Sequence, residues 1–485
     1  MSLNLNVTEV KKRDQRIGTI IAYHGSATEL IDKAEKHAYK EPQRTFRQCS
    51  DCSQGCAETL TTLVRDSATV IHAPLGCCNP ASNYASGLTA TKIRGLAPQK
   101  VQVISTNISV KDTVYGGIQK LRLAVYEAKE RFNPKAIFVH SSCAAGIIGD
   151  DIESLSDELE DELGIPIIPV YCEGFKSKTW ASGFDAVFHG ILRKLVKAPV
   201  KKDPNLVNIF NFQGLPIFTD LLAKLNLKPN YVVPLGSVDD LRLISSAACS
   251  THICETLGTY VAEALEEKYG VPQVKAPSPY GVKWTDEWIM AIAKLTGREQ
   301  LGEKLILEEH DRIRNRLEEV RKKLKGKKIY VFAGDSYAHN LAAVARDLGM
   351  EVVGITTLHH DQYTDSGDKE LNTLLKLVEN GGDIKEFSVC NRQPYILTKL
   401  LERLKPDVLI TRHNNMAVVG TKLGIPSFRT NDANIICGYD GIFVFAQRII
   451  DLLAKKKFYT NVSQHYTSPY TKWWQNEENP FYFDD

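Results

Sequence analysis

The residues of this 485-residue chain that are best suited to chemistry are its eleven cysteines. Five of them lie within thirty residues, in segments interrupted by glycine and proline. A chain of this length buries enough core to need no disulfides, and thiols in a reducing compartment serve more often as metal ligands. We therefore interpret this group as metal-binding, and regard the remote Cys172, Cys249 and Cys390 as buried hydrophobic side chains. The five grouped cysteines are Cys49, Cys52, Cys56, Cys77 and Cys78.

Three segments place a cysteine beside small residues: GCA at 55–57, HAPLGC at 72–77 and SSCAAG at 141–146. Iron–sulfur clusters need such surroundings, because thiolates converge on the irons while backbone N–H groups approach the sulfurs, and glycine permits that approach. The segments are far apart, so the pattern is not that of a compact ferredoxin. An alternative is a self-contained cluster or zinc knuckle on Cys49, Cys52 and Cys56, although no second CxxC or histidine pair completes it.

The elements that must position these residues follow from the hydrophobic pattern. Short runs rich in valine and isoleucine alternate with longer helical patterns, which predicts an α/β fold of parallel sheets covered by helices. The predicted strands are Val101–Ser105, Ala136–His140, Ile165–Tyr171, Leu206–Phe212, Tyr231–Pro234, Val274–Ala276, Lys328–Ala333, Glu351–Thr356 and Asp407–Thr411. The predicted helices include Gly116–Arg131, Thr256–Tyr269 and Leu305–Leu324.

The pattern divides into three predicted α/β domains. An N-terminal arm (1–45) precedes domains at 46–205, 206–325 and 326–455, and an aromatic tail (456–485) follows them. Ligands of parallel sheets collect at the carboxyl ends of the strands, and polar or sulfur-bearing residues follow several predicted strands. These segments are HSSC at 140–143, CEGF at 172–175, GDSYAH at 334–339, TLHHD at 357–361 and RH at 412–413.

Composition excludes several classes of protein. The formal net charge of +2 provides no field that would favour nucleic acid or an anionic membrane. The first residues, MSLNLNVTEVKKRDQR, lack the apolar core of a secretory signal, and no uncharged apolar run is long enough to span a membrane. We therefore expect a soluble, cytoplasmic protein.

Several segments resemble the D-type (alpha) subunits of the nitrogenase component 1 superfamily, over about residues 46–455. They include HAPLGC (72–77), SSCAAGIIGDDIE (141–153), PVYCEGF (169–175), EEKYGVP (266–272) and GYDGIFVFAQRI (438–449). The resemblance implies three Rossmann-like parallel-sheet domains around a central cofactor pocket. It also implies that Cys56, Cys77 and Cys143 hold half of an eight-iron, P-cluster-type relay cluster at a subunit interface, although Cys56 lies about five residues closer to Cys77 than is usual.

The same resemblance implies a second cluster and two partners. Cys254 lies sixteen residues before Gly270 and matches the cysteine that anchors a large iron–sulfur–carbide cofactor; the alternative is a buried cysteine at a helix start. The expected partners are a K-type (beta) subunit, in a D2K2 heterotetramer, and a homodimeric iron protein with a four-iron cluster. That iron protein, and not this chain, uses ATP.

Three departures from dinitrogen-reducing members bear on the substrate. The segment SFRTNDANIIC (427–437) has no histidine before GYDG, and GDSYAH (334–339) has no arginine. At the positions eight and twelve residues after Cys172, Trp180 and Phe184 replace glutamine and histidine. Aromatic rings there predict an apolar substrate pocket, unless both residues are core packing. Replacement ligands for the cofactor could come from Cys437, His360 or His413, and His360 is also a candidate proton donor.

Within the superfamily the chain resembles most closely the methylthio-alkane reductases. This implies the catalytic subunit of a nitrogenase-like oxidoreductase that cleaves C–S bonds of small thioethers, a reaction of sulfur metabolism. A scaffold for cofactor assembly is the first alternative, because it would keep the anchoring cysteine without the histidine. A tetrapyrrole reductase and a true nitrogenase are further alternatives. Cys49, Cys52 and Cys78 remain additional metal-ligand candidates.

Overall fold

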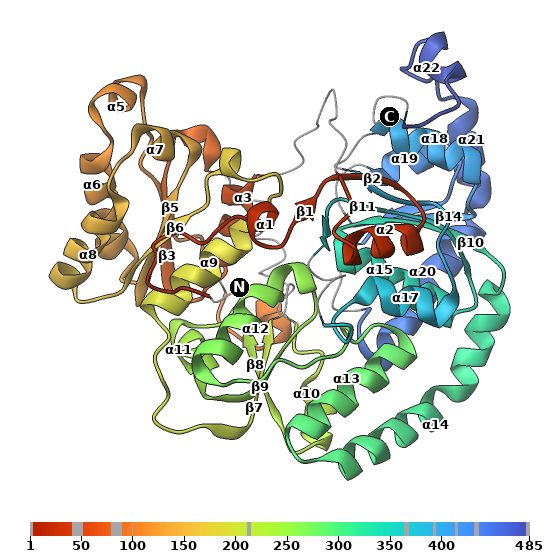
Figure 1. Cartoon of the computed structure of the whole chain (residues 1–485), viewed down its shortest axis with the longest axis horizontal. Helices are drawn as coiled ribbons and strands as arrows, with labels where there is room; N and C mark the ends of the chain where they lie inside the picture. Colours follow the sequence, from red (N-terminus) through yellow and green to blue (C-terminus); the bar gives the residue numbers. More distant parts are fainter. Residues whose placement is uncertain are drawn as a thin grey trace. The chain divides into compact units, whose positions relative to one another are not determined.

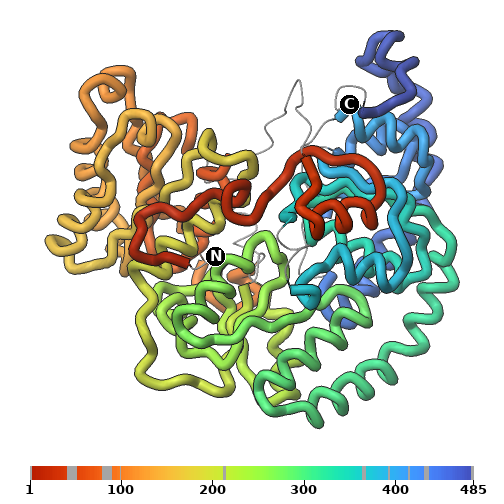
Figure 2. The backbone as a smooth tube through the Cα atoms, in the orientation of Figure 1, coloured from red at the N-terminus to blue at the C-terminus, as the bar shows by residue number. Residues whose placement is uncertain are grey.

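The computed structural model describes residues 3–40, 52–78, 90–98, 100–210, 215–362, 368–390, 394–412, 416–430 and 436–481. The chain forms two compact units (Figure 1). Unit 1 comprises Met1–Arg16, Asp51–Val274 and Ile292–Arg298, and unit 2 comprises Ile17–Ser50, Lys275–Ala291 and Glu299–Asp485. The N-terminal segment, red in Figure 2, therefore contributes to both units.

Unit 1 contains a four-stranded parallel sheet in the order β4-β3-β5-β6. Apolar side chains on one face of this sheet, such as Val70 and Val139, pack against Leu121 of α6 and Leu159 of α8. The helices α3 and α9 pack against the same strands, and Gly190 of α9 approaches the alternate side chains of β6, so they cover the opposite face. The bounds are β3 (Ser67–His72), β4 (Val103–Ser105), β5 (Ala136–Ser141), β6 (Ile167–Tyr171), α3 (Ser53–Thr61), α6 (Ile118–Phe132), α8 (Ile152–Leu163) and α9 (Ser182–Lys194).

The second sheet of unit 1 has three parallel strands in the order β8-β7-β9. Its helix α12 packs on β9 so closely that a Cβ at Gly258 would lie under 3.0 Å from the side chain of His252. The bounds are β7 (Asp203–Phe210), β8 (Lys228–Val232), β9 (Ala247–His252) and α12 (Glu255–Tyr269). The shorter helices of this unit are α1 (Arg13–Arg16), α5 (Val110–Tyr115), α7 (Cys143–Ile148), α10 (Thr219–Lys224) and α11 (Val238–Arg242).

Unit 2 contains a six-stranded sheet in the order β15-β14-β10-β11-β13-β2. All neighbouring strands are parallel except β2, which pairs antiparallel with β13. A separate pair joins β1 to β12. The strands are β1 (Thr19–Ile20), β2 (Ala22–Gly25), β10 (Lys328–Ala333), β11 (Glu351–Thr357), β12 (His360–Asp361), β13 (Phe387–Cys390), β14 (Val408–Thr411) and β15 (Ser427–Arg429). The helices are α2 (Ala27–Glu35), α14 (Glu299–Leu324), α15 (Asp335–Asp347), α17 (Thr373–Gly381), α18 (Pro394–Leu404), α19 (Met416–Lys422), α20 (Gly438–Ala454), α21 (Lys456–Gln464) and α22 (Lys472–Asn476), and α13 (Gly281–Leu295) begins in this unit.

The predicted α/β class with parallel sheets is confirmed. The strand predicted at Val274–Ala276 is wrong: the chain there makes only an isolated bridge, between Ser250 and Gln273. The sheets formed by β3–β6, β7–β9 and β10–β15 fall within or close to the three predicted domain ranges, and the division into three domains stays a prediction. None of the helices in the described part of the chain combines the length and the apolar character needed to cross a membrane.

Candidate metal sites at the strand ends

Three thiols of unit 1 gather beyond the carboxyl ends of the first sheet. Cys77 closes the turn after β3, and Cys143 begins α7 directly after β5. Cys52 precedes α3, where its Sγ accepts the N–H of Gly55 at 3.2 Å. Burial raises the pKa of the Cys52 thiol, and the neighbouring thiols of Cys143 and Cys77 raise it further. The fold therefore brings together one cysteine from each of three distant segments.

Glycine makes this gathering possible at the end of β6. A Cβ at Gly174 would lie 2.9 Å from the Cβ of Cys52 and 3.8 Å from the Sγ of Cys143. Any larger residue would therefore press on Cys52, so the glycine lets the backbone come close to the thiols. This is the environment that an iron–sulfur cluster needs, because backbone N–H groups then reach the cluster sulfurs.

His72 supports the loop that carries Cys77. Its Nε2 donates to Oδ2 of Asp150 at 2.8 Å, because a carboxylate can only accept, and its Nδ1 accepts from the hydroxyl of Thr106 at 3.0 Å. Burial lowers the pKa of His72, although Asp150 opposes the shift. Asp150 also accepts the N–H of Gly117 at 2.9 Å. The end of β3 is thus tied to two other loops at the same edge of the sheet.

A buried carboxylate and two lysines lie beside these thiols. Glu173, the residue before Gly174, accepts the hydroxyl of Ser141 at 2.7 Å and pairs with Lys176 at 3.2 Å. The Nζ of Lys12 lies 3.9 Å from the same carboxylate and donates to a backbone carbonyl of β6 at 2.9 Å. Glu9 pairs with both lysines, at 2.7 Å from Lys12 and 3.1 Å from Lys176, so two lysines and two carboxylates form a balanced charged group beside the thiols.

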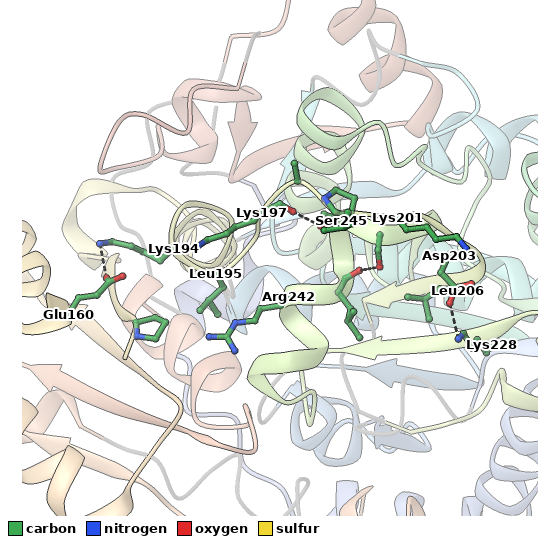
Figure 3. Close-up of a pocket in the computed structure, with 16 residues that line it drawn as sticks. Glu160, Lys194, Leu195, Lys197, Lys201, Asp203, Leu206, Lys228, Arg242 and Ser245 are labelled. Atoms are coloured by element: carbon green, nitrogen blue, oxygen red, sulfur yellow. Dashed lines mark hydrogen bonds and ion pairs between the residues drawn. The ribbon is translucent and has the colours of Figure 1, made fainter. Parts of the chain in front are cut away.

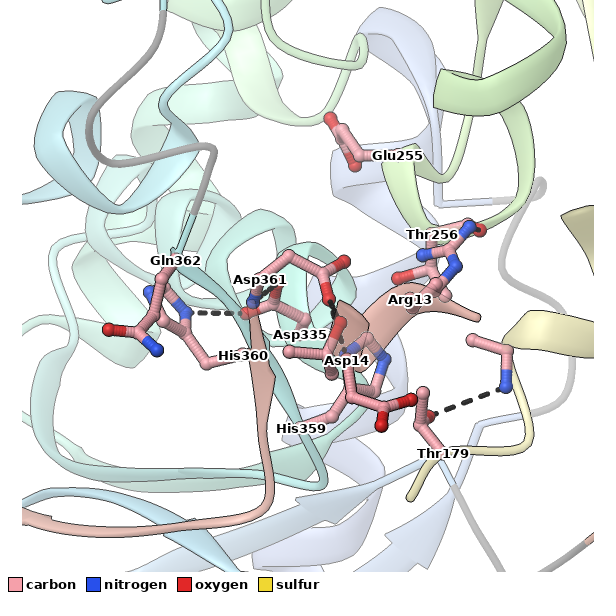
Figure 4. A network of polar contacts seen from close by, with 12 residues as sticks. Arg13, Asp14, Thr179, Glu255, Thr256, Asp335, His359, His360, Asp361 and Gln362 are labelled. Carbon is pink, nitrogen blue, oxygen red and sulfur yellow. Dashed lines mark hydrogen bonds and ion pairs between the residues drawn. The ribbon is translucent and has the colours of Figure 1, made fainter. Parts of the chain in front are cut away.

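Cys254 lies at the start of α12, at the end of the second sheet. Burial raises the pKa of its thiol to about 11, Glu255 adds to the rise, and Arg13 opposes it. Arg13 binds Asp185 through two hydrogen bonds, of 3.0 and 2.7 Å, and donates to the carbonyl oxygen of Thr256 (Figure 4). The N-terminal segment thereby holds the first turn of α12 next to Cys254.

Trp180 and Phe184 lie where α9 begins, and both are buried, with 6% and 4% of their surfaces exposed. This burial agrees with core packing as well as with the lining of a dry pocket, so their role as pocket residues stays a prediction. Cys172 is fully buried, and Cys249 and Cys390 are also buried.

The candidate ligands of unit 2 occupy several strand ends. His360 lies in β12, with its Nδ1 3.0 Å from Oδ1 of Asp335, the first residue of α15 (Figure 4). Cys437 precedes α20, is buried, and forms an isolated bridge with Tyr280. His413 lies outside the described residues.

Comparison with known proteins decides the family. The model of the nitrogenase component 1 type oxidoreductases matches residues 52–454. The chain belongs to the nitrogenase component 1 family. It is 26% identical to the nitrogenase molybdenum-iron protein alpha chain of Methanothermobacter thermautotrophicus, over 82% of this chain and 88% of the relative. It is 30% identical to the corresponding alpha chain of Methanococcus maripaludis, over 69% and 77%. It is 28% identical to the cofactor biosynthesis protein NifE of Clostridium pasteurianum, over 83% and 86%.

Solved structures of the family share this fold. The chain superposes on the structure of nitrogenase Cp1 at pH 6.5 with a TM-score of 0.71 and 20% identity, covering 88% of this chain and 93% of that one. The family is therefore the one that the sequence motifs predict, on the side of the alpha chains and of NifE.

One predicted relay residue of this nitrogenase-like chain is placed differently from its neighbours. Cys56 lies one turn inside α3, where it is 7% exposed, and Cys52, which precedes α3, lies near Cys77 and Cys143. The role of Cys56 as a relay ligand stays a prediction. Cys52 is 25 residues before Cys77, so choosing it removes four of the five residues by which Cys56 is too close. The spacing in the sequence therefore also makes Cys52 a candidate for this position. Cys78 follows Cys77, and burial raises the pKa of its thiol to about 11; Cys49 lies outside the described residues.

A cavity of about 780 Å³ lies elsewhere in unit 1 (Figure 3). Two of its lysines are paired: Lys194 with Glu160 at 2.9 Å and Lys228 with Asp203 at 2.8 Å. The described residues that line it include neither cysteine nor histidine, and none of the predicted site residues is among them. This basic cavity is therefore separate from the thiol sites.

Proposed function

We propose that this chain is the catalytic, D-type subunit of a nitrogenase-like reductase that acts in the cytoplasm and cleaves C–S bonds of small thioethers. The observation that supports it most is the gathering of Cys52, Cys77 and Cys143 from three loops, with Cys254 in the same unit. In the proposal the three gathered thiols hold one side of an eight-iron, P-cluster-type relay cluster, and Cys254 anchors the large iron–sulfur–carbide cofactor.

The donor set fits clusters of this kind. Thiolates are the preferred ligands of iron–sulfur clusters, and a lone thiol in each of several loops suits a cluster shared with a K-type subunit. Cys52 then takes the place that the motif alone assigns to Cys56. A bound cluster would pass electrons one at a time between the iron protein and the cofactor.

The protein must give up thiol protons when the clusters are loaded. The pKa values of Cys52, Cys77 and Cys254 are all raised, chiefly by burial, so each thiol is protonated near neutral pH without metal. Metal therefore competes with protons for these sulfurs. Loading would be favoured by the positive charge of Arg13 close to Cys254, since a cation stabilises the thiolate.

The apolar substrate follows from the aromatic residues at the start of α9. Trp180 and Phe184 would exclude water and contact the alkyl groups of a thioether, where dinitrogen-reducing members have polar side chains. Protons for the carbon and sulfur products would come from ordered water or from a histidine of unit 2. Electrons would come from the homodimeric ATP-dependent iron protein, docked on a D2K2 heterotetramer.

The first test is the iron and acid-labile sulfide content of the anaerobically purified complex with its K-type subunit. The proposal expects about sixteen irons per D–K pair, roughly eight in each cluster. Cys52→Ala should lower the relay iron, whereas Cys56→Ala should retain it, because Cys56 is buried inside α3. Equal loss in the two variants would contradict the assignment of Cys52. About four irons per pair would favour a tetrapyrrole reductase.

The second test is turnover. With iron protein, ATP and reductant, the complex should release methanethiol from a methyl thioether, and Cys254→Ala should abolish release while sparing the relay cluster. Ammonia from dinitrogen, without methanethiol, would instead identify a true nitrogenase. Absence of any turnover by an iron-replete complex would contradict the proposal.

The second candidate function is that of a scaffold on which the cofactor is assembled. It is favoured by the 27–28% identity to NifE proteins, which lies within the 25–30% range of identity to alpha chains. A scaffold would load the large cluster at Cys254 and then transfer it. Incubation of the loaded complex with a cofactor-free acceptor would show loss of about eight irons from this chain and no methanethiol.

A further inference from the structure

Unit 2 contains a cluster of imidazoles and carboxylates that the proposed function uses at most as a source of protons. Asp335 and His339 lie one turn apart on α15, directly after β10. His359 and His360 follow β11, and Asp361 follows them in β12. All five side chains are buried (Figure 4 labels all of these except His339). The cluster therefore stands where two neighbouring parallel strands end, the usual position of a ligand site in such sheets.

Three of these side chains are arranged around a common point. The Nδ1 of His360 lies 3.0 Å from Oδ1 of Asp335, and the Nε2 of His339 lies 3.8 Å from the same oxygen. One donor atom from each residue lies within 4.8 Å of the other two. Ligands bound 2.0–2.2 Å from one ion are roughly 3–3.5 Å apart, so small side-chain rotations would complete a site.

The negative charge of buried Asp335 would be stabilised by a cation bound between Asp335 and the two histidines. Its side chain is 9% exposed, and among the described residues its ion-pair partners are His339 and His360, with no lysine or arginine. A buried carboxylate is costly unless it is paired or binds a metal. Neutral imidazoles are good metal ligands but weak counter-charges, so a divalent ion would satisfy all three groups together.

Surrounding residues hold the ligands in the orientation that a metal requires. The Nδ1 of His339 is 2.9 Å from the hydroxyl of Thr373, which leaves Nε2 directed at Asp335. The other oxygen of Asp335 accepts the backbone N–H of Asp361 at 3.3 Å. The antiparallel pairing of Ile20 with His360 fixes the backbone of the second imidazole. Such outer contacts are characteristic of metal-bound histidines.

We propose that Asp335, His339 and His360 bind one divalent transition-metal ion, such as Zn²⁺ or Fe²⁺, in a site of two imidazoles and one carboxylate. The site uses no thiol and goes beyond the clusters of the proposed function. It commits His360 to this ion rather than to the cofactor or to proton donation. The ion would join α15 to the segment after β11.

The experiment measures Zn²⁺ binding to the iron-loaded complex, in which iron already occupies the cluster thiols. Equilibrium dialysis against Zn²⁺ alone, followed by elemental analysis, should give one equivalent per chain, and X-ray absorption should give a shell of N and O ligands at about 2.0–2.2 Å without sulfur near 2.3 Å. Asp335→Asn and His339→Gln should each lose this equivalent. His310→Gln is the matched control, because His310 pairs with Asp286 at 2.8 Å but belongs to no group of three possible metal ligands among the described residues.

Thr373→Val keeps all three proposed ligands and their charges, and it removes only the hydrogen bond that orients His339. It should weaken Zn²⁺ binding about 10- to 100-fold, the usual effect of losing an outer hydrogen bond to a metal ligand. Zn²⁺ should also raise the melting temperature of the wild type and not that of Asp335→Asn, and each variant's melt without Zn²⁺ shows whether it is folded.

Three results would overturn the proposal. The first is equal Zn²⁺ binding by the wild type and by folded Asp335→Asn. The second is a sulfur shell around the bound zinc. The third is loss of about eight irons from His360→Gln with Zn²⁺ binding unchanged, which would make His360 a ligand of the large cofactor. Since cluster iron and bound Zn²⁺ are counted separately, failure here leaves the proposed function to its own tests.

Discussion

Replacing Gly183 with alanine tests how closely α3 and α9 must pack to place Cys52. A Cβ at Gly183 would lie 2.8 Å from the carbonyl carbon of Ser53 and 3.0 Å from the backbone N of Ala57. Both contacts are with the backbone of α3, so no side-chain rotation relieves them. Overpacking of this kind costs up to about 3 kcal/mol. Alanine favours the helix over glycine by about 1 kcal/mol, so the net loss in the free energy of unfolding is about 2 kcal/mol.

Thermal melting and iron analysis of the complex measure the two consequences. A loss of about 2 kcal/mol corresponds to a fall in Tm of roughly 4–8 °C for a unit of this size. Relay iron should fall as well, because α3 begins at Cys52. Gly55→Ala is the matched control: its Cβ would meet only the Sγ of Cys52, at an ordinary 3.7 Å, so it should be neutral or slightly stabilising. If both variants melt within about 1 °C of each other and keep the relay iron, the packing argument is refuted.

Three further predictions concern charge and pH. Burial lowers the pKa of His140 to about 3, so below pH 6.5 the unfolded chain binds a proton that the native state does not. The free energy of unfolding should therefore fall by about 2 kcal/mol between pH 6.5 and pH 5. Urea unfolding should show a smaller fall for His140→Gln. Asp185→Asn removes the carboxylate that pairs with buried Arg13, and the free energy of unfolding should fall by about 3–5 kcal/mol. Thermal melting measures this loss, and an unchanged Tm would contradict the prediction. The pKa of Cys254 is about 11, so iron must displace its proton, and iron uptake at this thiol should increase from pH 7 to pH 9. The measurement is the difference in iron content between the wild type and Cys254→Ala. A difference that does not change with pH would refute the prediction.

The sequence was sufficient to predict the fold class and the main strand-end segments. Short, nearly continuous apolar runs predicted β5, β6, β10 and β11, because strands that are buried on both faces carry apolar residues at almost every position. It missed β9, whose sequence AACSTH is too polar and small for that pattern. It also missed the role of β2, because an edge strand joined to β13 depends on a contact between residues more than 360 positions apart.

The site was predictable only in part for a similar reason. Motif matching identified Cys77 and Cys143, whose loops follow strands of the same sheet. It assigned Cys56 rather than Cys52, and this assignment stays a prediction. Both cysteines lie in one short segment, so the choice depends on how α3 packs, which local spacing does not show. The association of Asp335 with His339 and His360 arises from the adjacency of β10 and β11, which no local spacing reveals.

The antiparallel edge strand β2 also has a consequence for how the protein is made. Cys390, the partner of Ala22 in this strand pair, is synthesised 368 residues after it. At roughly 5–20 residues per second, that delay is about 20–70 s. During this time β2 has no partner strand, so its backbone N–H and C=O groups are open to pairing with other chains.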